Sequence, residues 1–322
     1  MLYINYPRAS HSMEESHMVV ALSRSDSHYD GVIKVLDLLA DEIVDDMKKA
    51  KVILIKPNFV STHVSLSATP VDSVRALIDF IYKHVGRRHI IIAEGPALGS
   101  IDTALRNYDY ISLKNEYDVE FFDINEDPEY EVFKVYSRSL KRNVKIRVSK
   151  TVLEADYRIS ICRPKTHDTV VVTLSVKNMV MGAIMGSDKP KMHQGYLAIN
   201  MNIAEMARYL MPELAIIDGY IGMEGNGPVG GSPIKWGIAL AGTNPVEVDT
   251  LTTWLMGFEP RDVGYLFFLN KMGYGEIDPR NINVIGENPV NFRTRFTPHR
   301  TYRNQLSWRD RKEDGLRILG LI

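Results

Sequence analysis

Short apolar runs alternate with amphipathic stretches along most of the chain. Apolar residues recur every three or four positions over 30–49, 70–85 and 199–210, which is the spacing of helices that bury one face. The runs 52–55 and 157–162 are short and mostly apolar, as in strands that are covered on both faces. This alternation predicts an α/β fold with a largely parallel or mixed sheet flanked by helices.

Capping residues set the limits of two of these helices. Thr69 and Pro70 provide a cap and a first-turn proline, and Gly86 ends the same helix. Asn244 and Glu247 predict a second helix start, of the capping-box kind. Further helices are expected over 101–116 and 262–271, and further strands over 18–23, 89–93, 214–217, 238–241 and 282–285.

The segment 119–148 has a different pattern, with polar turns between short runs. Three of these runs predict strands: 119–124, 131–136 and 144–148. We therefore expect a small antiparallel insertion here. The whole chain is expected to divide into a polar N-terminal arm over 1–16, a single α/β domain over 17–290 and an arginine-rich C-terminal tail over 291–322.

Composition narrows the classes of function. A net charge of -1 gives no electrostatic basis for binding nucleic acid or membranes. Cys162 is the single cysteine, which excludes an intrachain disulfide and a cysteine-ligated zinc or iron–sulfur centre built from this chain alone. No apolar run is long enough to span a bilayer and the N-terminal residues lack a signal core, so we expect a cytoplasmic protein.

Ionisable side chains interrupt the apolar sequence between 156 and 195. One apolar run ends at a cationic loop that holds Lys165 and His167, and the next run carries Lys177, with His193 after it. Charged residues are rarely buried unless they are paired or used. For any one lysine, a structural ion pair or a stem lying along the surface stays an equal alternative. The group as a whole predicts a functional site.

Polar residues also follow several of the predicted strands directly. Because ligands bind beyond the carboxyl ends of the strands in open α/β sheets, these side chains are expected to converge at one edge. Eight residues should line one cleft: Lys56, Asn58, Glu94, Lys165, His167, Lys177, His193 and Asp218.

The predicted cleft has the chemistry of an anion site. Its lysines and Arg163 would suit a phosphate or a carboxylate, and neighbouring lysines depress one another's pKa, which can yield a nucleophilic amine. His167 and His193 could bind a metal or transfer protons. The glycine-rich stretch 224–231 lacks the Gly-Lys-Ser/Thr ending of a Walker motif. It could present backbone amides to an anion, but we favour a tight turn.

Taken in order, these motifs resemble the domain of unknown function 362. The resemblance covers residues 17–290 and rests on Ile55-Lys56-Pro57-Asn58, Arg163-Pro164-Lys165-Thr166-His167, Leu174-Ser175-Val176-Lys177-Asn178 with His193, Ile217-Asp218-Gly219, Glu224-Gly225-Asn226-Gly227-Pro228 and Asn244-Pro245-Val246-Glu247-Val248-Asp249. The resemblance implies no settled general activity. Many relatives carry an added ferredoxin-like module with cysteine ligands. This chain lacks those cysteines, so a redox role would need an outside electron donor.

A more distant similarity is to the catalytic domain of nickel-dependent lactate racemases. His167, Lys177 and His193 stand in the order of that family's histidine, cofactor-tethering lysine and nickel-binding histidine. The resemblance implies that Lys177 anchors a nickel-pincer nucleotide, that His193 binds metal and that His167 moves a proton. No histidine follows Glu94 where a second catalytic histidine is expected, which argues against two-base racemisation. A one-base or hydride-type reaction stays open.

The leading hypothesis is an isomerase or oxidoreductase that acts on a small anionic substrate, with a divalent metal such as nickel or a nucleotide-derived cofactor. Its catalytic residues are expected to be His167, Lys177 and Lys165. Its cofactor contacts are expected to be Lys177, Lys56, Asn58, Asn178 and Gly227, and its metal ligands His193, Asp218 and Glu224. The alternative is a non-catalytic ligand-binding or electron-transfer subunit that works with an external ferredoxin-like iron–sulfur protein.

Overall fold

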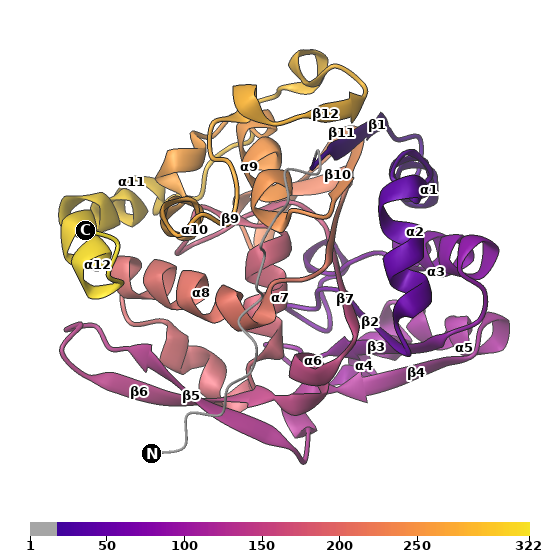
Figure 1. The fold of residues 1–322 in the computed structure, drawn as a ribbon, viewed down its shortest axis with the longest axis horizontal. Coiled ribbons are helices and arrows are strands. Elements are labelled where there is room, and N and C mark those ends of the chain that lie inside the picture. The colour runs from indigo at the N-terminus through magenta and orange to yellow at the C-terminus, as the bar shows by residue number, and fades with distance from the viewer. Residues whose placement is uncertain (1–17) are drawn as a thin grey trace.

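A mixed, mainly parallel sheet forms the centre of the computed structural model, which describes residues 18–322 (Figure 1). Its strands are β1 Val20–Arg24, β2 Val52–Lys56, β3 His89–Glu94, β4 Val119–Asp123, β7 Tyr157–Cys162, β8 Lys165–Thr166, β9 Val172–Thr173, β10 Leu214–Asn226, β11 Gly230–Gly242 and β12 Val284–Gly286. They lie in the order β12–β1–β11–β10–β7–β2–β3–β4, with β8 beside β10 and β9 beside β8. The strands from β10 to β4 are parallel, whereas β11 is antiparallel to β10 and β1. The predicted fold class is therefore confirmed.

Helices cover both faces of this sheet, as Figure 1 shows. The first face carries α1 His28–Leu38, α2 Ala40–Lys49, α3 Val71–His84, α4 Ile101–Asn107 and α5 Leu113–Glu116. The second face carries α6 Lys150–Glu154, α7 Ser175–Ala183, α8 Tyr196–Leu210, α9 Pro245–Leu255 and α10 Gly264–Lys271. Each face buries its own apolar cluster, which explains why the central strands are apolar at nearly every position.

The alternation of side chains along β2 places the first site residue. Ile53 and Ile55 pack among the helices of the first face, and Leu54 packs among those of the second. Successive strand residues point to opposite faces, so Lys56 at the end of β2 turns toward the second face and meets Asn178 of α7. The alternation of side chains along β2 therefore places the buried Lys56 side chain against α7.

Two predicted helices and the predicted insertion are divided differently in the structure. The helix expected over 30–49 breaks at Leu39, where α1 ends and α2 begins. The helix expected over 101–116 is interrupted at Asp109, whose φ of 60° is left-handed. An amphipathic pattern keeps its phase across such breaks, so periodicity alone misses them. The run from 119 belongs to the main sheet as β4, beside β3, and the antiparallel insertion contains only β5 Tyr130–Tyr136 and β6 Asn143–Ser149.

The glycine-rich stretch 224–231 is the tip of a long hairpin between β10 and β11. Each of these strands has 13 residues, so the strands expected over 214–217 and 238–241 were predicted too short. The missed part is half-buried and rich in polar residues and glycine, so it lacks an apolar signal. The turn that we favoured for this stretch is therefore observed, with a cis peptide bond between Gly227 and Pro228.

The arginine-rich tail packs against the body of the protein. It contains α11 Tyr302–Gln305 and α12 Lys312–Ile318, and its Phe296, Trp308 and Leu316 are buried in the apolar cluster of the second face. The polar arm expected over 1–16 lies outside the described residues. Within residues 18–322, every helix is too short or too polar to cross a membrane.

Candidate functional site

A pocket lies beyond the carboxyl ends of β2 and β3, against α7. Its volume is about 200 Å³. Six of the eight side chains predicted for one cleft line it: Lys56, Asn58, Glu94, His167, Lys177 and His193. The two others, Lys165 and Asp218, are not among its lining residues. The fold therefore brings together predicted site residues up to 137 positions apart, from Lys56 at the end of β2 to His193 after a 3-10 helix.

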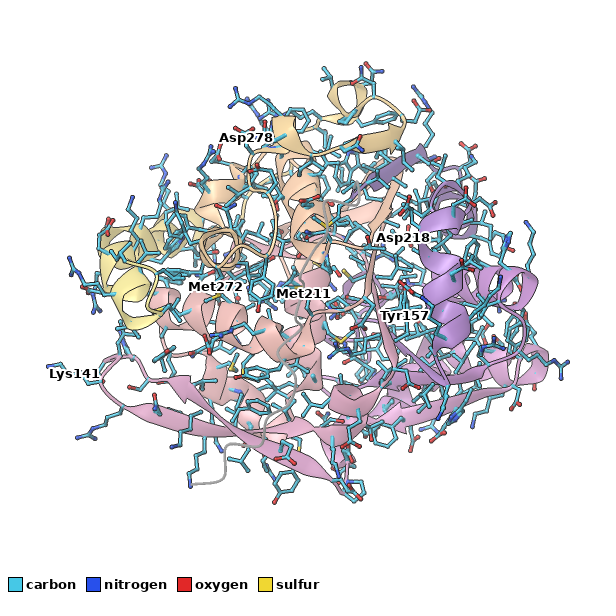
Figure 2. The ribbon with its side chains drawn as sticks, viewed as in Figure 1. Lys141, Tyr157, Met211, Asp218, Met272 and Asp278 are labelled. Carbon is cyan, nitrogen blue, oxygen red and sulfur yellow. The ribbon has the colours of Figure 1, made fainter. Side chains whose placement is uncertain are left out.

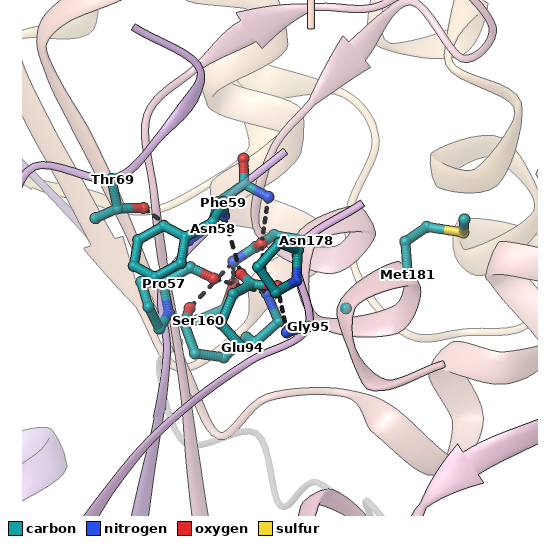
Figure 3. A network of polar contacts seen from close by, with 12 residues as sticks. Pro57, Asn58, Phe59, Thr69, Glu94, Gly95, Ser160, Asn178 and Met181 are labelled. Atoms are coloured by element: carbon teal, nitrogen blue, oxygen red, sulfur yellow. Dashed lines mark hydrogen bonds and ion pairs between the residues drawn. The ribbon is translucent and has the colours of Figure 1, made fainter. Parts of the chain in front are cut away.

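A buried ion pair, Lys56–Glu94, lines the pocket. Figure 3 shows the network of polar contacts around Glu94 and Asn178. Lys56 Nζ lies 2.5 Å from Glu94 Oε2, and it also donates to Asn178 Oδ1 at 3.1 Å and to the carbonyl of Pro57 at 2.7 Å. Its three N–H groups are all used. A Cβ at Gly182 would lie 1.9 Å from Lys56 Cε, so only glycine lets α7 approach this closely.

Amide side chains extend the network beneath the pocket. Asn58 Nδ2 donates to Asn178 Oδ1 at 2.9 Å, and Asn178 Nδ2 donates to the carbonyl of Lys56 at 3.1 Å. Lys165 Nζ donates to Asn58 Oδ1 and, at 2.6 Å, to the carbonyl of Ser67. Burial lowers the pKa of Lys165 to about 7. Lys165 therefore supports Asn58 from behind and does not face the pocket.

Buried charges bind the backbone at both ends of α7. The Asp249 carboxylate accepts the N–H groups of Ser175 and Val176 at 2.8 and 2.9 Å. Burial raises the pKa of Asp249 to about 8, while these two hydrogen bonds act in the opposite direction. At the other end, Lys189 Nζ donates to three carbonyls, those of Met181, Gly182 and Ile184. The carboxyl group thus lies at the N-terminus of the helix and the amine at its C-terminus, the placement that complements the helix dipole.

Lys189 lines the pocket and was not predicted. It stands within the stretch that the sequence singled out, but no local pattern indicates that its amine folds back onto α7. Burial lowers the pKa of Lys189 to about 7. Its three hydrogen bonds use all of its donors.

Lys177 is the pocket lysine whose N–H groups have no acceptor among the described residues. It lies in the first turn of α7 and is 8% exposed. Burial lowers the pKa of Lys177 to about 8, with Lys56 acting in the same direction and Asp168 opposing. The ammonium N–H groups of Lys56 and Lys189 all donate to atoms of the protein, so Lys177 is the lysine available to a ligand.

His167 is buried beside Lys177. Its Nδ1 accepts the backbone N–H of Thr169 at 3.0 Å, so Nε2 carries the proton in the neutral ring. Asp168 Oδ1 also lies 3.0 Å from Nδ1, and its side chain is half exposed. The backbone N–H of Thr169 can only donate, so we assign the tautomer from its hydrogen bond. Burial first and the charge of Lys177 second hold the pKa of His167 well below its usual range. His193 is exposed at the rim of the pocket.

The three expected metal ligands, His193, Asp218 and Glu224, stay apart. Asp218 follows Ile216 in the alternation of β10 and faces the helices of the first face (Figure 2), where His28 Nδ1 of α1 and Ser73 Oγ of α3 lie 2.7 and 2.5 Å from its Oδ2. Glu224 accepts the backbone N–H of the tail residue 297 at 2.7 Å. Over residues 18–322 there is no group of three His, Cys, Asp or Glu that could hold a metal ion.

Gly227, expected to contact a cofactor, lies instead against the backbone of Thr166. A Cβ at Gly227 would be 2.2 Å from the carbonyl oxygen of Thr166. Its neighbour Pro228 lines the pocket. Glycine at this position therefore permits the hairpin tip to close over the His167 loop.

Comparison with known proteins identifies a family but not an activity. The model of a family described as "Domain of unknown function (DUF362)" matches residues 53–254. The "Thylakoid-associated protein sll1697" of Synechocystis sp. (strain ATCC 27184 / PCC 6803 / Kazusa) is 24% identical over 227 residues, which are 69% of this chain and 68% of that protein. The lactate racemase apoprotein from Thermoanaerobacterium thermosaccharolyticum aligns with a TM-score of 0.45 and 14% identity, over 62% of this chain and 50% of its own. The chain thus matches half the length of that racemase.

Proposed function

The chain belongs to the DUF362 family, whose description names no activity, and we propose that it is an enzyme acting on a small carboxylate or phosphate. One observation carries the proposal: Lys177 presents to the pocket a largely buried amine whose donors have no acceptor within residues 18–322. An unpaired buried cation is costly, and an anion bound beside it would offset that cost. The attraction is stronger there than in water because the effective dielectric constant is lower.

The size of the pocket favours a small ligand. Its volume of about 200 Å³ is below the roughly 300–1,000 Å³ typical of sites for drug-sized molecules. The Lys56–Glu94 pair is neutral overall and the Lys189 ammonium is covered by carbonyls. The excess positive charge at the open side of the pocket therefore resides on Lys177, with Asp168 nearby but turned partly to solvent.

The proposed chemistry is proton transfer on the bound anion. Lys177, with a pKa of about 8, can exchange a proton near neutral pH, and the Nε2–H of the neutral His167 ring can donate a hydrogen bond to the anion. An isomerase would need nothing more than such transfers. An oxidoreductase would need a redox cofactor in addition. Lys165 would act only through Asn58, because it lies outside the lining of the pocket.

A metal held by protein side chains alone does not fit these residues, since His193 has no two further donors of the usual kinds around it within residues 18–322. An anionic, nucleotide-derived cofactor could bind Lys177. Lys56, Asn58 and Asn178 form hydrogen bonds with one another and are less available to it. A cytoplasmic location remains part of the proposal. The second hypothesis, a binding or electron-transfer subunit for an iron–sulfur protein, uses the same pocket without turnover.

Ligand-induced stabilisation tests the proposal. Sulfate, phosphate and a panel of small carboxylates should raise the melting temperature, because a ligand specific for the native state stabilises it. Lys177→Ala should abolish the shift, and Lys141→Ala, an exposed lysine, should retain it. Ligands that bind are then followed by NMR in D₂O for deuterium incorporation. Binding without exchange or turnover would favour the subunit hypothesis, and a shift unchanged in Lys177→Ala would place the anion elsewhere.

A further inference from the structure

The C-terminal tail reaches the loop that carries His167. Gln305 of α11 is 1% exposed, and its side-chain amide bonds this loop at two points. Its Oε1 accepts the N–H of Val171 at 2.5 Å, and its Nε2 donates to the carbonyl of His167 at 2.8 Å. Gln305 lies outside residues 53–254, the part of the chain that the family model matches. The pocket loop is therefore held by a segment beyond the family domain.

The loop itself is strained. Val171 has a φ of 68°, a left-handed conformation that a β-branched residue rarely adopts. It is the centre of a three-residue turn, in which the N–H of Val172 donates to the carbonyl of Val170 at 2.8 Å. The N–H of His167 also donates to the carbonyl of Val171 at 2.8 Å. Such a conformation persists only where its surroundings impose it.

We propose that Gln305 is a positioning residue that imposes the strained turn at Val171 and thereby fixes the ring of His167 in the pocket. The amide of Gln305 offers one acceptor and one donor, which match the two backbone groups. Thr301 of the same segment adds a third contact, from its Oγ1 to the carbonyl of Asp168 at 2.8 Å. The loop also holds Thr169, whose N–H selects the tautomer of His167, so a shift of the loop would alter the tautomer.

The inference rests on the proposed function only in assuming that the pocket lined by His167 is functional. Its test needs no substrate. The ¹⁵N spectrum of the imidazole rings reports the tautomer of His167 in the full chain. The wild type should show a neutral ring with the proton on Nε2. Gln305→Ala leaves two buried backbone groups without partners, so the turn should relax, and the ring should show a mixture of tautomers.

A second substitution separates positioning from a general loss of structure. Val171→Gly in the Gln305→Ala background removes the cost of the left-handed turn, since glycine adopts positive φ freely. The tautomer should return to the wild-type state, while the melting temperature falls further because a buried valine side chain is lost. If Gln305 had a purely structural role, the double variant would show both a lower melting temperature and a mixture of His167 tautomers. Sulfate affinity should drop about tenfold in Gln305→Ala and recover in the double variant.

Controls keep the test decisive. Ser307→Ala changes an exposed neighbour in the tail and should leave the His167 signals unchanged. If Gln305→Ala does not fold, Gln305→Glu replaces it: the carboxylate can still accept from Val171 but cannot donate to His167, so a partial change is expected. A folded Gln305 variant with wild-type His167 signals would overturn the proposal. So would a folded double variant without recovery. A wild-type protein that does not bind sulfate, with the tautomer change and its rescue intact, would count against the proposed function instead.

Discussion

Lys56 Nζ and Glu94 Oε2 lie 2.5 Å apart in the wall of the pocket, and neither side chain is more than 3% exposed. Glu94 also accepts the backbone N–H groups of Phe59 and Gly95, so it joins the ends of β2 and β3. A charge pair this deeply buried is held by hydrogen bonds on all sides. Its main role is to organise the pocket, because the donors of Lys56 are spent within the protein.

Breaking this pair should destabilise the protein strongly. Lys56→Met leaves the Glu94 carboxylate buried without its partner, which should cost about 3–5 kcal/mol of unfolding free energy. Urea unfolding measures the loss. Removing both charges, in Lys56→Met with Glu94→Leu, should cost less than the sum of the single losses. Lys49→Ala, which removes an exposed ion pair, is the control and should behave as the wild type. Additive losses would show that the two residues are not coupled.

Replacement of Lys177 should have the opposite effect on the free energy of unfolding. Lys177→Met removes a buried amine that has no acceptor among the described residues, so the protein should gain about 1 kcal/mol of stability while it loses anion binding. Thermal unfolding with and without sulfate measures both effects. A Lys177→Met protein as unstable as Lys56→Met would show that Lys177 is a structural residue.

Anion affinity should depend on pH through Lys177. A bound anion favours the charged amine, so affinity should be constant well below pH 8 and fall as the pH rises through the pKa of about 8, by up to about tenfold per pH unit. Sulfate is the suitable ligand because its own charge does not change in this range. Calorimetric titrations from pH 6 to 10 should also show proton uptake on binding near pH 8. Affinity that is flat across this range would exclude Lys177 as the binding cation.

The same lysine predicts a trend in stability. The folded-state pKa of Lys177 lies below the unfolded value near 10.4, so the unfolded chain binds more protons between the two values. The contribution of this group to the unfolding free energy should therefore rise from pH 8 to 10. Urea unfolding of the wild type and of Lys177→Met isolates it, because the trend should be weaker in the variant. An identical trend in both proteins would assign it to Lys165 and Lys189 instead.

Removing the carboxylate at the start of α7 should impair both stability and binding. Asp249→Ala leaves the amides of Ser175 and Val176 without an acceptor, at a cost of about 2 kcal/mol. The first turn of α7 carries Lys177, so sulfate affinity should fall as well. Asp41→Ala, in the exposed first turn of α2, serves as the matched control. If Asp249→Ala were destabilised but bound sulfate with unchanged affinity, the cap at Asp249 would not be needed for anion binding at Lys177.

The sequence predicted those parts of the site that depend on the period of the sheet. Lys56 and Glu94 end β2 and β3, and His167 follows β8. Parallel strands bring their carboxyl ends together, so this part of the cleft could be assembled from local patterns. The same reasoning misplaced Asp218, because the face on which a residue lies depends on the register of its strand. It also missed Lys189, whose amine folds back onto carbonyls five to eight residues earlier, and Gln305, whose backbone partners lie 134 and 138 residues away. No spacing in the chain encodes such contacts.

The dependence of Val171 on Gln305 joins two positions that are 134 residues apart in the chain. Over evolutionary time, a change at one of them should alter which residues selection accepts at the other. A relative that lacks the amide at position 305 is expected to carry glycine, asparagine or aspartate at position 171, because these residues adopt left-handed conformations at little cost. Relatives whose C-terminal segment is shorter should show the same replacement, so the two positions should covary across the family.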